Sequence, residues 1–125
     1  MTDNEQINVV VTVDFSEAIM TRLREISPRL NVKKYTSAVP DNVWSTAEVL
    51  YTSRIFPAPE DAPMLRWIQL NSAGLERAMQ HPVVKTGAVQ VTSASGIHAQ
   101  QIANYCLMMM LAFNYKLPAM MRYQQ

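Results

Sequence analysis

Glycine is scarce in this sequence of 125 residues, which contains only Gly74, Gly87 and Gly96. Neither a G-x-G-x-x-G loop nor a Walker-type phosphate loop can be built from glycines at these spacings. Acidic residues are unevenly placed, because all ten lie at or before Glu76. A carboxylate that acts as a general base or binds a ribose must therefore come from residues 1–76. Both kinds of glycine-rich phosphate loop are excluded from this chain.

Cysteines, charge runs and long apolar runs are also nearly absent. The single cysteine, Cys106, cannot form an internal disulfide, and no secretory signal pattern opens the sequence. The formal charge is +1 and the longest basic run is Lys33-Lys34, a balance that excludes a basic footprint for nucleic acid or anionic membranes. The longest apolar run, YCLMMMLAF, falls well short of the roughly 20 residues of a membrane span. We expect a cytoplasmic protein with neither kind of partner.

Strand-like and helix-like segments alternate up to residue 94. Segments rich in β-branched and aromatic residues occupy 7–15, 30–35, 48–53, 66–72 and 88–94, and helical patterns occupy 17–26, 40–47 and 74–81. In the first helical pattern, Ser16 is the expected cap, and the expected apolar stripe consists of Ile19, Met20, Leu23 and Ile26. The alternation predicts an α/β fold, a flavodoxin-like parallel sheet of about five strands with helices on both faces.

A long helix is expected after Gly96. Residues 98–116 contain neither glycine nor proline and are rich in good helix formers. The pattern is apolar on nearly all sides after Tyr105, which predicts burial on most sides. Pro118 is expected to kink or end the helix.

The turn after the fourth expected strand has unusually small side chains. Residues 71–74 read Asn-Ser-Ala-Gly, and helix 74–81 is expected to begin directly after them. Backbone N–H groups of Ala73, Gly74 and Leu75 would then lie at a helix N-terminus and at the carboxyl edge of the sheet. Such a turn can hold a carboxylate, although small residues in a βα turn often serve only the turn itself.

Two stretches together resemble a known family. The match consists of the WIQ-x-x-SAG turn, the G-x-x-x-V-T strand, the GIHA helix start, the IA-x-Y segment and the apolar helix that ends in LP. This ordered series resembles the D-isomer-specific 2-hydroxyacid dehydrogenases, including the glyoxylate/hydroxypyruvate reductase-like members. The resemblance is good over residues 65–120, whereas over residues 7–60 only the layout of the expected strands and helices is similar.

The resemblance implies a domain organisation. Residues 1–94 would form the substrate domain, and residues 95–125 the hinge and first long helix of a Rossmann domain that binds NAD or NADP. The family's catalytic Arg, acid and His and its glycine-rich loop lie downstream of the matched segment. We therefore expect a fragment with no catalytic, cofactor-binding or metal-binding residue of its own, which binds no cofactor and is inactive alone. The polar end of the sequence, which lacks a helix stop signal, agrees with this expectation.

Five substrate-binding residues are expected. They are Ala73, Gly74, Leu75, Arg54 and Ser95. Arg54 follows the third strand at the same sheet edge as the turn, where a cation can hold a carboxylate. By the resemblance, Ser95 faces the hinge between the two domains. An exposed arginine in a proline-rich loop is the alternative for Arg54.

Other polar residues are assigned lesser roles. By the resemblance, His98 caps the long helix or lines the cleft, because the family's catalytic histidine comes much later. His81 is expected at the surface, and two isolated histidines make no metal site. Asn104 stands where the family usually has Glu, so the polar role of that position is in doubt.

The resemblance leaves two functions open. One is the interconversion of D-2-hydroxy acids and 2-oxo acids by hydride transfer in a homodimer that associates through helix 98–116. The other is a non-catalytic regulator of the same fold that senses dinucleotide and binds partner proteins. The downstream sequence would discriminate between them.

Overall fold

The computed structural model describes residues 6–124. The chain divides into two compact units, Met1–Ala94 and Ser95–Gln125, and each is described by itself. The assignment of the second unit to a cofactor domain stays a prediction.

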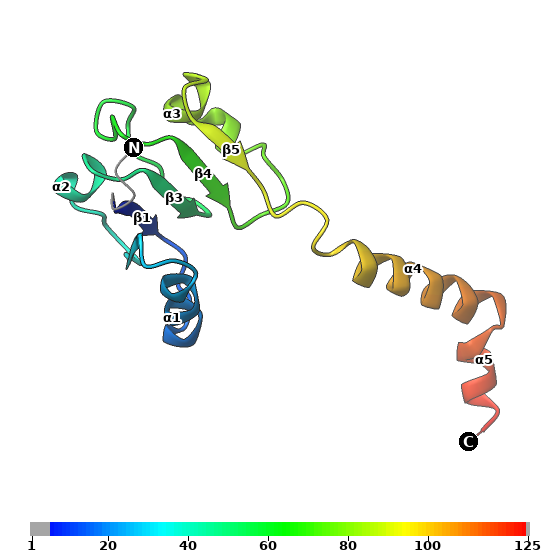
Figure 1. The fold of residues 1–125 in the computed structure, drawn as a ribbon. Coiled ribbons are helices and arrows are strands. Elements are labelled where there is room, and N and C mark those ends of the chain that lie inside the picture. Colours follow the sequence, from blue (N-terminus) through cyan, green and yellow to red (C-terminus); the bar gives the residue numbers. More distant parts are fainter. Residues whose placement is uncertain (1–5, 125) are drawn as a thin grey trace. The chain divides into compact units, whose positions relative to one another are not determined.

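The first unit is built on a five-stranded parallel sheet (Figure 1). Its strands are β1 (Ile7–Val11), β2 (Leu30–Lys34), β3 (Val49–Thr52), β4 (Trp67–Leu70) and β5 (Gln90–Thr92), in the order β2-β1-β3-β4-β5. This is the strand order of a flavodoxin-like sheet, and the predicted fold is confirmed. β1 is shorter than predicted, because the pairing with β3 ends where Val11 lies opposite Tyr51.

Both faces of the sheet carry an apolar core. Side chains alternate along β1, so that Val10 belongs to one cluster and Val11 to the other. The larger cluster holds Trp44 of α2 (Asp41–Trp44) and continues to Val83 and Val84 of α3 (Pro82–Lys85). The smaller cluster packs α1 (Glu17–Glu25) against β1 and β2. Helices therefore lie on both faces, as the alternation of segments predicted.

The apolar stripe predicted on α1 is only partly correct. Met20 is fully buried against the sheet, whereas Ile19 is 40% exposed and Ile26 is 70% exposed. The helix ends at Glu25, so Ile26 stands beyond its last turn, and only a narrow face meets the sheet. Ser16 occupies the N-cap position, but its side chain makes no capping hydrogen bond.

The crossover from β4 to β5 differs from the predicted helix 74–81. It contains a short 3-10 helix, η1 (Ala78–Gln80), and the one-turn helix α3. Pro82 lacks an N–H group and holds the preceding His81 in an extended conformation, with φ of −78° and ψ of 136°. A continuous helix through His81 is therefore impossible. Instead, α3 begins at Pro82 and ends before Gly87, in the manner usual for proline at helix starts and glycine beyond helix ends.

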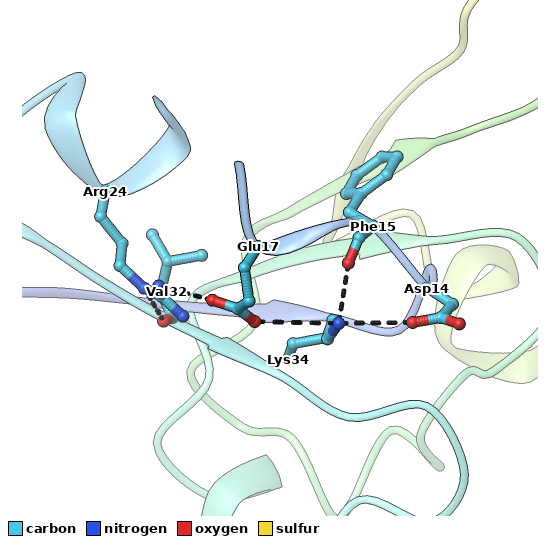
Figure 2. A network of polar contacts seen from close by, with 6 residues as sticks. All are labelled: Asp14, Phe15, Glu17, Arg24, Val32 and Lys34. Carbon is cyan, nitrogen blue, oxygen red and sulfur yellow. Dashed lines mark hydrogen bonds and ion pairs between the residues drawn. The ribbon is translucent and has the colours of Figure 1, made fainter. Parts of the chain in front are cut away.

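A polar network ties the loop after β1 to β2 (Figure 2). Lys34 Nζ donates a 2.7 Å hydrogen bond to the Phe15 carbonyl oxygen and lies 3.3 Å from Asp14 Oδ1. It also lies 3.9 Å from Glu17 Oε1, and Arg24 bridges from Glu17 to the Val32 carbonyl oxygen. The loop after β1 is therefore held to β2 by the Lys34 side chain.

The second unit consists of two helices, α4 (Ala99–Asn114) and α5 (Leu117–Arg122). The predicted long helix is confirmed; it ends before Lys116, which adopts a left-handed conformation with φ of 53°. Contrary to the expected burial, α4 buries none of its side chains in this structure. Up to Gln124, the second unit contains only the helices α4 and α5, so no further element of this unit covers the apolar residues of α4.

His98 stands at the N-cap position of α4, but its side chain makes no capping hydrogen bond; the alternative, that it lines a cleft, stays a prediction. Its backbone is already nearly helical there, with φ of −102° and ψ of −1°, unlike the extended backbone of a side-chain cap. No helix among residues 6–124 is long and apolar enough to cross a membrane.

Candidate substrate-anion site

Two loops meet at the carboxyl edge of β3 and β4. Thr52 and Leu70 lie opposite each other at the ends of these parallel strands, so the loops that follow them start side by side. Between the loops lies an open hollow of about 560 Å³. We call it the Arg54 hollow; it is lined by Ser53, Arg54, Ser72, Gly74, Glu76, Arg77 and Gln80.

Thr52 fixes the loop that carries Arg54. Its hydroxyl is fully buried; it accepts a 3.1 Å hydrogen bond from the Ile55 N–H and donates one of 2.9 Å to the Ile55 carbonyl oxygen. The Thr12 hydroxyl donates a further hydrogen bond of 2.7 Å to the same Thr52 oxygen. The loop 52–55 is thus closed by one side chain, which leaves Ser53 and Arg54 on its outer side.

Replacing Thr52 with valine is expected to lower the free energy of unfolding by about 1–3 kcal/mol. Valine keeps the shape of the side chain but leaves the two Ile55 backbone groups without this partner and removes the shorter of the two hydrogen bonds of the Thr12 hydroxyl. Urea denaturation measures the loss, and hydrogen exchange at the Ile55 amide should accelerate. The control is Thr36→Val at an exposed position, where a change within about 0.5 kcal/mol is expected. Equal effects of the two substitutions would contradict this role of Thr52.

The turn after β4 leaves backbone donors exposed. Asn71 N–H bonds the Thr52 carbonyl oxygen at 2.9 Å, and the Ser72 hydroxyl donates to the Gly74 carbonyl oxygen at 3.0 Å. In the described part of the chain, the N–H groups of Ala73, Gly74 and Leu75 donate no hydrogen bond to another residue. Three successive free donors on an exposed turn can bind an anion.

The turn itself differs from the expected helix N-terminus. Residues 71–73 form bends, residues 74 and 75 have no regular secondary structure, and the first helical residue, Ala78, opens only the short 3-10 helix η1. The donors of Ala73, Gly74 and Leu75 therefore act as single peptide dipoles, without the aligned dipole of an α-helix. The positive φ angles of glycine are confined to Gly87 and Gly96, so Gly74 is not required for a left-handed backbone.

Two arginines give the Arg54 hollow a positive character. Both Arg54 and Arg77 line it and are exposed. Within residues 6–124, neither guanidinium forms an ion pair. Glu76 is the one acid among the residues that line the hollow. The arrangement suits a small anion, because guanidinium groups and free N–H groups both donate strongly to carboxylate oxygens.

The five predicted site residues are placed as follows. Arg54 and Gly74 line the same hollow, whereas Ala73 and Leu75 are exposed on either side of Gly74 but do not line it. Ser95 is exposed in the second unit and is not a lining residue. Their role in substrate binding stays a prediction.

Sequence reasoning missed most of the polar lining. The lining residues Ser53, Ser72, Glu76 and Arg77 are not among the site residues predicted from the sequence, although each lies within three residues of Arg54 or Gly74. The available signal was the parallel sheet itself, because every polar residue just after two adjacent strands reaches the same edge.

The described residues do not fit a dinucleotide. A phosphate loop of the kind that binds dinucleotides needs glycines just after the first strand. In this chain the loop after β1 contains Asp14 and Phe15 and no glycine, and the Lys34 network closes it. No mechanistic step of a cofactor is therefore assigned to residues of this chain.

The chain resembles parts of two solved dehydrogenase structures. One is a phosphoglycerate dehydrogenase from Lactobacillus plantarum, with a TM-score of 0.58 and 23% identity over 85% of this chain and 34% of that chain. The other is a D-lactate dehydrogenase from Aquifex aeolicus in complex with NAD and lactic acid, with a TM-score of 0.62 and 19% identity. The latter match covers 84% of this chain and 33% of that chain.

The chain thus spans about a third of the length of both dehydrogenases, and the likeness is one of fold. No protein-family model and no curated protein matches the chain.

Proposed function

We propose that this chain is the substrate domain of an NAD(P)-dependent oxidoreductase that interconverts D-2-hydroxy acids and 2-oxo acids of the glyoxylate or hydroxypyruvate type. The observation that carries the proposal is the set of free N–H groups of Ala73, Gly74 and Leu75 beside the Arg54 hollow. The fold shared with two dehydrogenases and the resemblance of residues 65–120 to the D-2-hydroxyacid dehydrogenases support it.

In this proposal the residues of the chain bind and orient the acid. The N–H groups of the turn hold the substrate carboxylate, and Arg54 with Arg77 attracts the anion to the edge of the sheet. Bonds from backbone to an ionised group contribute about 1.5–3 kcal/mol each before ordering costs. A nicotinamide bound to a separate domain would supply or accept the hydride. The proton-transferring residues belong to sequence beyond this chain in the same proposal.

A titration of the chain tests the proposal directly. Pyruvate serves as a stable 2-oxo monocarboxylate, added up to tens of millimolar while ¹H–¹⁵N spectra are recorded. We expect saturable shifts at the amides of Ala73, Gly74 and Leu75, and weaker shifts elsewhere. Shifts that are absent, or spread evenly over the surface, would refute the site.

The regulator that senses dinucleotide remains the second candidate. It stays open because the residues that would distinguish it from the enzyme, the catalytic Arg, acid and His and the dinucleotide loop, are expected downstream of the matched segment. A chain joined to its own following domain discriminates the two functions. Reduction of glyoxylate or hydroxypyruvate with NAD(P)H supports the enzyme, whereas dinucleotide binding without turnover supports the regulator. The 125-residue chain alone is expected to show neither.

We also expect the chain to self-associate through helix 98–116. The residues of α4 that remain more than half exposed include Ile102, Leu107, Met108, Met110, Leu111 and Phe113. A contiguous apolar surface of this kind seldom stays in contact with water in a stable monomer.

Sedimentation equilibrium measures the association between about 5 and 500 μM, a range in which dimers of moderate affinity dissociate. Leu107→Gln with Leu111→Gln should shift the chain toward monomer. Gln100→Glu with Gln101→Glu, at polar positions of the same helix, provides a control for surface changes. A strict monomer at the highest concentration would contradict the prediction.

A further inference from the structure

The carboxylate of Glu76 lies on the turn at which the substrate anion is proposed to bind. A β-carbon placed on Gly74 would collide with Glu76 Oε2 and lie 3.3 Å from Glu76 Cδ. The glutamate side chain thus folds back over the bare face of Gly74. Glu76 and Gly74 line the Arg54 hollow together.

Nothing in the described part of the chain holds the Glu76 side chain in place. It is exposed, and within residues 6–124 it accepts no hydrogen bond and forms no ion pair. Glutamates that serve the fold behave differently, as Glu48 shows: its carboxylate meets Arg66 at 2.8 Å and accepts a hydrogen bond from the Asn8 N–H. Glu76 is therefore free to leave Gly74 when another group takes its place.

The position of Glu76 matches the chemistry of the proposed ligand. A carboxylate is the group that free N–H groups and two arginines bind, and Glu76 presents one from two residues along the same turn. A substrate carboxylate at Gly74 would need the same space and would meet a like charge. Both effects weaken binding as long as the side chain stays folded back.

We propose that Glu76 is an internal competitor for the anion site, a residue that tunes affinity by covering Gly74 until the 2-oxo acid displaces it. This inference rests on the proposed function, because it concerns the same turn. The competition has two separable parts. One is the negative charge near the hollow, and the other is the reach of a side chain long enough to cover Gly74.

Two substitutions separate these parts. Glu76→Gln removes the charge and keeps the reach, whereas Glu76→Asp keeps the charge and shortens the reach. We expect both to lower the Kd for pyruvate. Glu76→Gln should lower it by roughly fivefold, the change that the loss of one like-charge contact at about 4 Å in water produces, and Glu76→Asp by a smaller factor, because the shorter side chain uncovers Gly74 but keeps its charge. The matched control is Glu25→Gln, which removes the same charge from an exposed position near the end of α1 and should leave the Kd unchanged.

The measurement is the pyruvate titration of ¹H–¹⁵N spectra, repeated for each variant. In the wild-type chain, the side-chain ¹³Cδ resonance of Glu76 should also move as pyruvate saturates the turn, and that of Glu25 should not. All three substitutions lie at exposed positions, and the amide spectra without ligand report directly that each variant is folded.

The outcomes separate this inference from the proposed function. Tighter pyruvate binding by both Glu76 variants than by the wild-type chain supports the competition. This holds even if the wild-type chain binds pyruvate too weakly to reach saturation. Tighter binding in Glu76→Gln alone would overturn the inference in favour of a distant charge effect. An unchanged Kd in both variants would overturn the inference but leave the proposed binding site intact. Absence of pyruvate binding in every chain would overturn the inference and the proposed function together.

Discussion

Replacement of Gly74 with valine is expected to raise the KM for the 2-oxo acid on the order of 10- to 100-fold in an enzyme in which a dinucleotide-binding domain follows this chain. The branched side chain would cover the N–H groups that hold the carboxylate, and the loss of one charge-assisted backbone bond costs about 1.5–3 kcal/mol. The KM for NAD(P)H should stay within about twofold, because the dinucleotide does not bind the turn in the proposed function. Steady-state kinetics with each substrate varied in turn measures both constants.

The structure explains why this variant should fold. Gly74 has no positive φ angle, and the three atoms nearest to a new β-carbon all belong to the end of the flexible Glu76 side chain. The melting temperature of the variant should therefore stay within a few degrees of the wild-type value, since a change of 1 kcal/mol shifts it by about 4 °C in a domain of this size.

Gly87→Val provides the opposite control. Gly87 has open space where a β-carbon would lie but a φ of 71°, where valine is strained by about 1–3 kcal/mol. This variant should lose stability without a change in either KM. An unchanged KM for the 2-oxo acid in Gly74→Val would mean that residues 71–75 serve only as a turn, and the main site assignment would be wrong.

Replacement of Ile68 with alanine is expected to have the largest effect on stability. Ile68 is fully buried in the middle of β4, opposite Leu50 of β3 and Val91 of β5. Alanine would leave a cavity in the larger core cluster on one face of the sheet and lower the free energy of unfolding by about 2–5 kcal/mol. Small domains have about 5–15 kcal/mol in total, so a large part of the stability of the sheet would be lost.

The matched control is Ile26→Ala, the same chemical change at a position that is 70% exposed at the end of α1. A loss within about 0.5 kcal/mol is expected there. Urea denaturation followed by circular dichroism compares the two variants with the wild-type chain. Similar losses in both variants would contradict the placement of Ile68 at the centre of the core.

Much of the fold could be predicted because it depends on local patterns. The run Ile7–Val11 is β-branched on both faces of the strand, which only a sheet covered on both sides can bury. The helical pattern of 98–116 is likewise local, since intrinsic propensity suffices to predict its existence. The crossover after β4 was misjudged at residues 74–81, although Pro82 and Gly87 frame α3 in the manner usual for helix starts and ends.

The candidate site could be predicted only in part. The small residues of the turn were visible in the sequence, and so was Arg54 after the third strand. The partners of these residues were not, because Glu76 and Arg77 become neighbours of Arg54 only when β3 and β4 pair in parallel. The position of Glu76 over Gly74 depends on side-chain rotamers in an irregular turn, and no residue spacing encodes those.

The sequence by itself determined the class of fold and excluded a glycine-rich phosphate loop, because strand periodicity and the absence of a residue type are properties of the chain alone. The tertiary structure alone decided which residues share the Arg54 hollow, since long-range strand pairing brings together loops that are about 20 residues apart in the sequence. It also decided that Gly74 is bare through small size and not through a left-handed backbone. The φ angle of Gly74 depends on the path that the chain takes between β4 and η1, and hydrogen bonds at both ends of the turn fix that path.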